Sequence, residues 1–167
     1  PVRKMVFGGT SMTAGVLINY LPAHMVYRTP QMQRIFDGFL MDGPSNPHAE
    51  LRPEDIDYVN THGTSTPAGD VAEVRAIRTV LGNRHVAYSS TKGYTGHTVS
   101  AAGAIEAIFT LAMLRGGWVA PSIHARPLDP ELQDYPPVLD PTSKPMTHAL
   151  SNSFGFGGTN VSLVLSA

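Results

Sequence analysis

Two hydrophobic periods alternate along this chain, and each change of period predicts where a strand gives way to a helix. Short apolar runs of strand type occur at residues 2–7, 56–60, 86–89, 147–150 and 161–165. Apolar residues at helical spacing occur at residues 32–40, 71–81 and 101–114. Strands that alternate with helices predict an α/β layer architecture.

Local signals place the ends of these helices. Thr29 and Pro30 have the form of an N-cap followed by proline at the first helical position. Asp70 and Glu73 have capping-box spacing at the start of the second helix, whose apolar face is expected to contain Val71, Val74, Ile77 and Leu81. Residues 16–27 are apolar without a period, and the proline-rich residues 121–145 predict an extended loop.

Polar, glycine-containing turns follow three of the short strands, at residues 60–69, 91–103 and 151–160. Ligands of α/β sheets bind beyond the carboxyl ends of the strands, so we expect the three turns to converge on one site. The last turn is rich in glycine and leads into a strand, an arrangement that presents backbone N–H groups to a phosphate or an oxyanion. A flexible hairpin turn is the alternative, which the aromatic rings of Phe154 and Phe156 disfavour.

Histidine, lysine and glutamate are the candidate chemical groups. His62 and His97 lie beside glycines in two of the turns, which favours a shared functional role. Lys92 alone would be interpreted as a solvated side chain. Glu106 lies in a helix that is apolar nearly all round, which predicts burial and hence a partner for the carboxylate, either Lys92 or a bound metal ion.

Composition narrows the classes of partner. The 167 residues suit one domain, and a net charge of −1 gives no reason to expect a nucleic-acid partner. The chain has no cysteine, and therefore no disulfide and no thiol nucleophile of its own. No signal peptide is visible, and Glu106 interrupts the longest apolar stretch, so we expect no membrane association and a cytoplasmic location.

Three motifs together resemble one family. They are V-N-T-H-G-T-S-T-P-A-G-D at residues 59–70, S-T-K-G-Y-T-G-H at residues 90–97 with A-A-G at 101–103, and S-N-S-F-G-F-G-G-T-N at 151–160. In this order they are similar to the C-terminal signatures of β-ketoacyl-[acyl-carrier-protein] synthases, most of all the KAS I/II group. The resemblance covers residues 56–165 well and residues 1–51 poorly.

The resemblance implies the thiolase-like fold, of which residues 1–167 would be the C-terminal half, a mixed sheet layered with helices. It also implies decarboxylative condensation of malonyl-acyl-carrier protein with an acyl group held on a cysteine. His62 and His97 would be the active-site histidines, and Lys92 would organise His97. The backbone N–H of Phe156 would contribute to the oxyanion hole, while its ring gates the acyl pocket.

Further positions match by the same resemblance. Thr64, Thr66 and Phe154 would contact the substrate, the threonines by holding the phosphopantetheine arm of the acyl carrier protein. Glu73 would be coupled to the lysine. A buried monovalent or divalent cation occurs in some members, and the positions that match its surroundings are Asn60, Glu106, Ser151 and Asn152.

The missing cysteine is the main departure from the family pattern. The nucleophile of the family lies on the N-terminal half, so we expect this chain to need that half, and the acyl carrier protein, as partners. The intact enzyme would be a homodimer or a heterodimer. The chain alone is not expected to be active. Ser100 replaces a usual glycine, and residues 8–27 differ from the family's segment.

Three other functions stay open at this stage. The chain could be a non-catalytic partner subunit of the chain-length-factor type, although such a subunit has no chemical need for two histidines and a lysine. Ser89 and Lys92 have the S-x-x-K spacing of serine hydrolases, but here the serine ends a strand. His62 and His97 could bind a metal ion, although no ligand-spaced cluster accompanies them.

Overall fold

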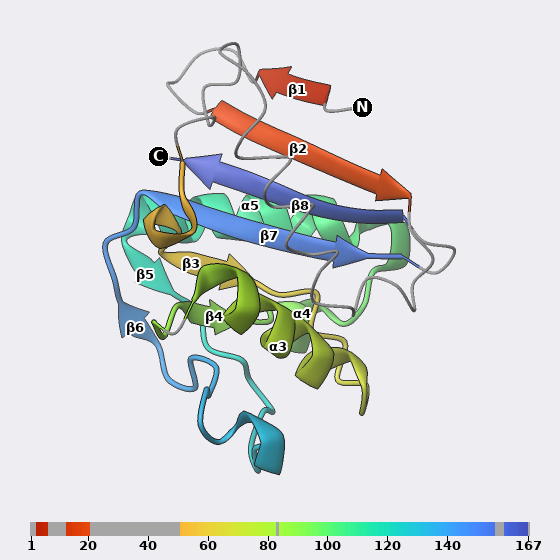
Figure 1. Cartoon of the computed structure of the whole chain (residues 1–167), viewed down its shortest axis with the longest axis vertical. Coiled ribbons are helices and arrows are strands. Elements are labelled where there is room, and N and C mark those ends of the chain that lie inside the picture. Colours follow the sequence, from red (N-terminus) through yellow and green to blue (C-terminus); the bar gives the residue numbers. More distant parts are fainter. Residues whose placement is uncertain (1–2, 7–12, 21–50, 83, 156–158, 167) are drawn as a thin grey trace.

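The computed structural model describes residues 3–6, 13–20, 51–82, 84–155 and 159–166, the first two ranges by their backbone (Figure 1). Its strands are β1 (Arg3–Val6), β2 (Thr13–Tyr20), β3 (Tyr58–Asn60), β4 (Ala87–Ser89), β5 (Trp118–Val119), β6 (Thr142–Ser143), β7 (His148–Phe154) and β8 (Thr159–Ser166). Its α-helices are α3 (Gly69–Leu81), α4 (Lys92–Thr95) and α5 (Ala102–Gly116). Short 3-10 turns span Pro53–Asp55, Val99–Ala101 and Pro130–Leu132.

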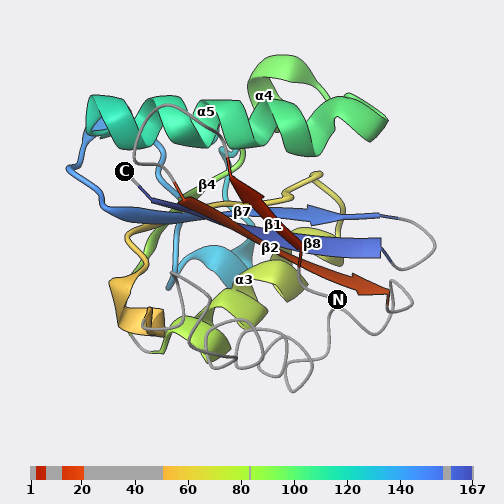
Figure 2. The same ribbon diagram turned by 90° about the horizontal axis from the view of Figure 1, so that it is seen from above.

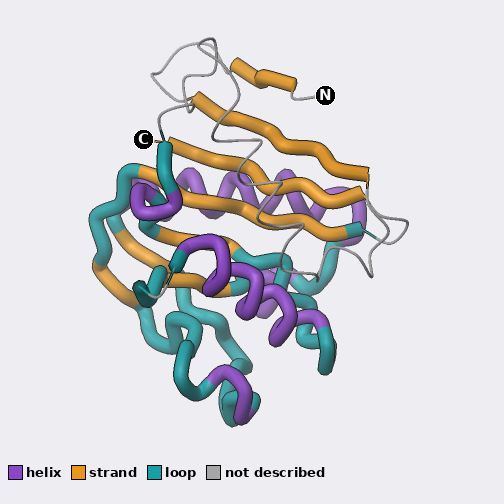
Figure 3. The backbone as a smooth tube through the Cα atoms, viewed as in Figure 1, coloured by secondary structure: helices purple, strands orange, loops and turns teal. Residues whose placement is uncertain are grey.

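A mixed sheet forms the middle layer. Its strand order is β1-β2-β8-β7-β3-β4, with β7, β3 and β4 parallel and the other neighbours antiparallel. Helix α3 lies on one face of the sheet, and α4 and α5 lie on the other (Figure 2). The tube in Figure 3 shows the same strands side by side with helices before and behind them. The expected α/β layering is therefore present.

Strand alternation divides the core in two. Val59, Leu150 and Val164 belong to a buried cluster with the apolar face of α3. Their neighbours in sequence, Tyr58, Ala149 and Leu165, belong to a second cluster with Met113 and Leu114 of α5. Successive strand residues point to opposite faces, so each strand contributes to both clusters.

The start of α3 differs from the prediction. Its N-cap residue is Ala68, without a side-chain capping bond, so the predicted capping box is wrong. Asp70 lies inside the helix and accepts a hydrogen bond from Ser65 N at 3.1 Å, while Glu73 reaches back to the turn that precedes the helix. The predicted apolar face is buried as expected, and Gly82 follows the last helical residue with a φ of 75°.

The sequence predicts that helix α5 is buried on every face, and the structure shows that it is not. Glu106 and Met113 are buried, whereas Ile108 is 64% exposed and Val99 just before the helix is 76% exposed. Among the described residues, Val99–Gly116 is long and apolar enough to cross a membrane, with 28% of it buried, a test that core helices of soluble proteins also pass. An exposed apolar stripe therefore runs along the outer face of this helix.

The N-terminal expectations are tested only in part. Strand β1 confirms the first predicted strand, and β2 occupies part of the aperiodic segment that predicted no element. The helix predicted at residues 32–40 lies outside the described residues. The proline-rich segment is mostly irregular, as expected, and includes β6 and the turn Pro130–Leu132.

Candidate active site

The carboxyl ends of two parallel strands bring the first two turns together. Asn60 at the end of β3 pairs with Ser89 at the end of β4, and Thr61 N donates to Ser89 O at 2.9 Å. Beyond these ends, the first turn contains His62 and the second contains Lys92 and His97. The convergence expected for these two turns is therefore present.

Gly63 is the point where the two turns touch. Its φ is 38°, and a Cβ atom at this position would lie 2.6 Å from Ser90 Cβ. Ser90 Oγ donates to Gly63 O at 2.9 Å and accepts from Lys92 N at 3.3 Å. Only a residue without a side chain allows this approach, so Gly63 and Ser90 fix the distance between the histidine turn and the lysine turn.

The two histidine rings face each other. Their centroids lie 5.5 Å apart with an angle of 85° between the planes, and the Phe154 ring lies 5.4 Å from that of His62. Val99 N donates to Nδ1 of His97 at 3.1 Å. In its neutral form, His97 therefore carries its proton on Nε2, which is free to donate to a ligand.

His62 is held neutral by its surroundings. Burial first, and then the positive charge of Lys92 and the neighbouring His97, lower its pKa to about 4. Its Nδ1 is buried, with no hydrogen-bond partner within the described part of the chain. A neutral imidazole with an unpaired ring nitrogen can form a hydrogen bond with a substrate atom without adding a full charge to the site.

Lys92 and Glu106 form a buried ion pair between α4 and α5. Their exposed fractions are 7% and 2%, and Nζ of Lys92 donates to Oε1 of Glu106. Burial raises the pKa of Glu106, and the hydrogen bond and charge of Lys92 oppose the rise. The expectation of a cationic partner for Glu106 is confirmed. The expected approach of Lys92 to His97 or Glu73 is replaced by this pair.

Glu73 binds the backbone of the histidine turn instead of a lysine. Its two carboxylate oxygens accept from His62 N and Gly63 N, each at 3.0 Å, and Oε1 also accepts from Asn152 Nδ2 at 3.0 Å. Burial raises its pKa to about 7, and the three hydrogen bonds limit the rise. The predicted coupling of Glu73 to Lys92 is therefore wrong in this structure.

The positions matched to a cation divide between two faces of the sheet. Asn60 pairs with Ser151 in register, and its amide donates to Glu106 O at 3.3 Å and to Thr110 Oγ1 at 3.1 Å. Oε2 of Glu106 is buried without a hydrogen-bond partner in the described residues and is an available acceptor. Asn152 points the other way, toward Glu73. Asn60, Glu106 and Ser151 therefore lie on one side of the sheet and the Asn152 side chain on the other, and the role of these residues around a cation stays a prediction.

A metal centre built on the histidines finds no support in the described ranges. No group of three or more histidine, cysteine, aspartate and glutamate side chains that could hold a metal ion occurs there. The positive charge beside Glu106 comes from Lys92. The buried cation stays a prediction.

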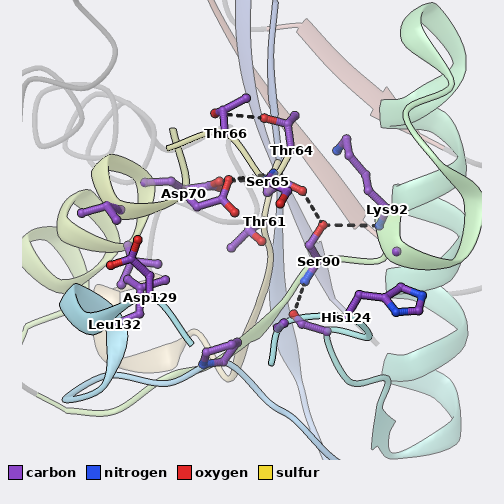
Figure 4. A pocket seen from close by; sticks show the side chains of 18 of the residues that line it. Thr61, Thr64, Ser65, Thr66, Asp70, Ser90, Lys92, His124, Asp129 and Leu132 are labelled. Carbon is purple, nitrogen blue, oxygen red and sulfur yellow. Dashed lines mark hydrogen bonds between the residues drawn. The ribbon is translucent and has the colours of Figure 1, made fainter. Parts of the chain in front are cut away.

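A pocket of about 600 Å³ opens beside the lysine turn (Figure 4). Thr64 and Thr66 line it, and their hydroxyl groups lie 3.4 Å apart. Ser65, Asp70, Ser90 and Lys92 also line it, as Figure 4 shows. The pocket offers side-chain hydroxyl groups to a ligand, and the substrate-binding role of the two threonines stays a prediction.

Some contributors had no signal in the sequence. Ser90 begins one of the motifs and Ser162 lies between Val161 and Leu163 of a strand, and only the fold shows that Ser90 bridges two turns and that Ser162 orients Asn152. Asp70 does carry a signal, but as a helix cap. Residue Phe156, assigned to the oxyanion hole, lies outside the described residues, so its role stays a prediction.

Comparison with known proteins finds sequence similarity in the part of the chain that contains these turns. Residues 45–126 match the family "Beta-ketoacyl synthase, C-terminal domain". The chain is 52% identical over 110 residues to 3-oxoacyl-[acyl-carrier-protein] synthase 1 of Escherichia coli K12, which covers 66% of this chain and 27% of that protein. It is 47% identical over 118 residues to 3-oxoacyl-[acyl-carrier-protein] synthase 2 of Staphylococcus aureus COL, covering 70% and 28%.

Solved structures extend the likeness to nearly the whole chain. A β-ketoacyl synthase from Burkholderia phymatum STM815 superposes with a TM-score of 0.77 at 35% identity, over 92% of this chain and 37% of that one. AntDE:AntF, a type II PKS acyl-carrier protein in complex with its ketosynthase bound to the hexaketide, gives 0.76 at 30% identity, over 92% and 37%.

The fold and the paired turns define a ketosynthase-type chain with the thiolase-like fold. More specifically, the chain belongs to the β-ketoacyl synthase family and corresponds to the C-terminal part of KAS I/II-type members. It spans 27% and 28% of the length of the two curated relatives described above.

Proposed function

We propose that this chain is the enolate-forming half of a β-ketoacyl-acyl-carrier-protein synthase. The observation that carries the proposal is the pair of imidazole rings, 5.5 Å apart, of which the His97 ring lines the pocket. The reaction is a decarboxylative condensation of a malonyl thioester with an acyl group bound to a cysteine elsewhere in the enzyme.

The histidines would stabilise the enolate. When the bond from malonyl C2 to its carboxylate breaks, CO2 leaves and the electron pair spreads onto the thioester oxygen. Nε2–H of His97 and the neutral His62 ring can donate to that oxygen at the moment its negative charge develops. The enolate carbon then attacks the acyl carbonyl, forms the new C–C bond and expels the cysteine thiolate.

Lys92 supports this step without touching the substrate. Its positive charge beside Glu106 helps lower the pKa of His62, which keeps that ring neutral across the physiological range. A neutral ring donates a hydrogen bond to the enolate oxygen without giving up its proton. Lys92 therefore acts on the reaction through His62.

The pocket would hold the arm that carries malonyl. A phosphopantetheine arm is long, narrow and rich in amides, and Thr64 and Thr66 present hydroxyl groups to the pocket that would hold it. Phe154, beside the His62 ring, would border the thioester end. An acyl carrier protein is accordingly the proposed partner, supported by the ketosynthase relative whose complex contains one.

The N-terminal half is the second proposed partner. The apolar stripe on α5, with Val99 and Ile108 exposed, is a surface that such a half could cover. Burying Val99–Gly116 in that way would account for its apolar character, and the assembled enzyme would be a cytoplasmic homodimer or heterodimer, in line with the expectation from sequence.

The test combines this chain with a cysteine-bearing N-terminal half and measures malonyl-acyl-carrier-protein decarboxylation and condensation. We expect no β-ketoacyl product from this chain alone and product from the assembled pair. His62→Ala and His97→Ala should each lower decarboxylation by about 10²–10³-fold, the effect of removing one oxyanion donor. His85→Ala, whose ring contacts Tyr135 away from the pocket, is the matched control.

Two results would overturn the proposal. One is turnover of acyl and malonyl thioesters by the isolated chain. The other is an assembled pair that decarboxylates malonyl equally well with and without His62 and His97. An assembled pair that binds the carrier protein but shows no turnover would favour the non-catalytic partner subunit instead.

A further inference from the structure

A line of hydrogen bonds connects the sheet to the backbone of His62. Ser162 Oγ on β8 donates to Asn152 Oδ1 on β7 at 2.9 Å, and Asn152 Nδ2 donates to Glu73 Oε1 at 3.0 Å. Glu73 on α3 then accepts from His62 N and Gly63 N. Asn152 and Glu73 are 2% and 3% exposed, so water does not compete for these bonds.

Glu73 can hold this arrangement only as a carboxylate. It accepts three N–H groups, and a protonated carboxyl would turn an O–H donor toward one of them. The lysine nearest the site, Lys92, is paired with Glu106. Three N–H donors stabilise the buried negative charge of Glu73, whereas the ammonium group of Lys92 stabilises that of Glu106.

The groups around Glu73 show why the Asn152 amide is needed to stabilise the Glu73 carboxylate. Asp70 on the same helix raises the pKa of Glu73 and so opposes the carboxylate, while Glu73 in turn raises the pKa of Tyr88 on β4. From the turn come the N–H groups of His62 and Gly63, and from β7 comes the Asn152 amide. Asn152 is the side-chain donor among these, and Ser162 holds its amide with the nitrogen toward Glu73.

We propose that Asn152, oriented by Ser162, is a positioning residue: it keeps Glu73 ionised and bound to the His62–Gly63 backbone, and thereby fixes the His62 ring opposite His97. This inference rests on the proposed function for its consequence in catalysis, but the hydrogen-bond relay itself can be tested without any activity. It differs from the expected role of Asn152 near a cation.

The first test follows Glu73 in this chain by carboxyl carbon NMR. Wild-type Glu73 should titrate near pH 7, the value set by burial and its donors. Loss of one hydrogen bond to the charged form in Asn152→Ala should move the midpoint upward by about one to two pH units. At pH 7.5 the amide protons of His62 and Gly63 should then exchange with solvent at least about tenfold faster than in the wild type.

A milder pair of variants guards against loss of folding. Ser162→Ala removes the hydroxyl that orients Asn152 and should shift the Glu73 midpoint in the same direction by a smaller amount. Ser166→Ala on the same strand removes a hydroxyl that binds His148 Nδ1 and should leave the midpoint unchanged. A midpoint unmoved in folded Asn152→Ala or Ser162→Ala overturns the proposal, as does an equal shift in Ser166→Ala.

The second test reads the assembled enzyme. In Ser162→Ala the low-pH limb of the malonyl decarboxylation profile should move to higher pH, by the same shift as the Glu73 midpoint in the NMR titration. Activity above pH 9 should change little. Glu73→Gln should show low activity without that pH dependence. An NMR shift together with histidine variants that retain activity contradicts the proposed function alone. A decarboxylation profile that stays in place while the NMR midpoint moves overturns the positioning role.

Discussion

The charge state of each buried residue in this site depends on the charges and hydrogen-bond donors next to it. Lys92 and Glu106 neutralise each other, Glu73 is held by N–H donors, and His62 stays neutral beside them. Motif order was enough to predict the histidines and Lys92 as site residues. It was not enough to pair Glu73, because the partner depends on which face of β7 the Asn152 side chain takes, and only the sheet decides that.

The pKa of His62 gives a prediction at this scale. Because burial is the largest cause of its low pKa and Lys92 the second, Lys92→Met should raise the pKa of His62 from about 4 without restoring the ordinary value near 6.5. Imidazole proton NMR of the chain between pH 3 and 8 measures it. Lys144→Met, in the segment beside β6, should leave the titration of His62 in place; equal shifts in both variants would contradict the assignment.

The buried pair gives a second prediction. Glu106→Ala leaves the Lys92 ammonium buried without its partner and should lower the free energy of unfolding by about 3–5 kcal/mol. Glu131→Ala removes an exposed ion pair with Arg75 and should cost about 1 kcal/mol or less. Urea unfolding of the two variants compares them, and equal midpoints would show that Glu106 is solvated.

Among the elements, the periods of hydrophobic residues predicted β1, β3, β4, β7, β8 and the helices α3 and α5, which the structure confirms, although β7 runs on to Phe154 within the predicted glycine-rich turn. What the pattern did not predict is the exposed side of α5. A helix that is apolar on every side is predicted to be buried. The sequence of one chain does not show whether its own sheet or another polypeptide covers the second side.

The two sides of α5 should respond differently to mutation. Met113 is 1% exposed, so Met113→Ala should lower the free energy of unfolding by about 2–5 kcal/mol. Ile108→Ser, at an exposed position, should change it by at most about 0.5 kcal/mol and should instead weaken assembly with the N-terminal half. Urea unfolding of the chain and sedimentation of the mixture give the two readouts. An Ile108→Ser chain that assembles normally would place the partner elsewhere.

For the whole molecule, two shifted groups act on stability in opposite directions. The folded pKa of His62 lies near 4, below its ordinary value, so its contribution is present above about pH 6.5 and is lost as pH falls toward 4. The folded pKa of Glu73 is raised from 4.5 to about 7, so its contribution is present below 4.5 and is lost as pH rises through 7. Between pH 4.5 and 6.5 the two slopes offset each other.

Removing either group should therefore tilt the pH profile of stability. Relative to the wild type, Glu73→Gln should lose stability as pH falls from 6.5 to 4.5, and His62→Ala should gain it over the same range. Urea midpoints at several pH values measure both. Parallel profiles for the three proteins would mean that neither group has a shifted pKa in the folded chain.

The proline-rich segment has a consequence for how this sheet can meet other polypeptides. Strand β4 is the last strand of the sheet, and its outer side would offer free backbone groups to any extended peptide. Val138 N instead donates to Tyr88 O, Ser90 N donates to Ser122 Oγ, and Val86 N donates to the hydroxyl oxygen of Tyr135. Prolines in the covering segment cannot donate a further ladder bond. The β4 edge of the sheet is thus closed to pairing with a strand of another polypeptide.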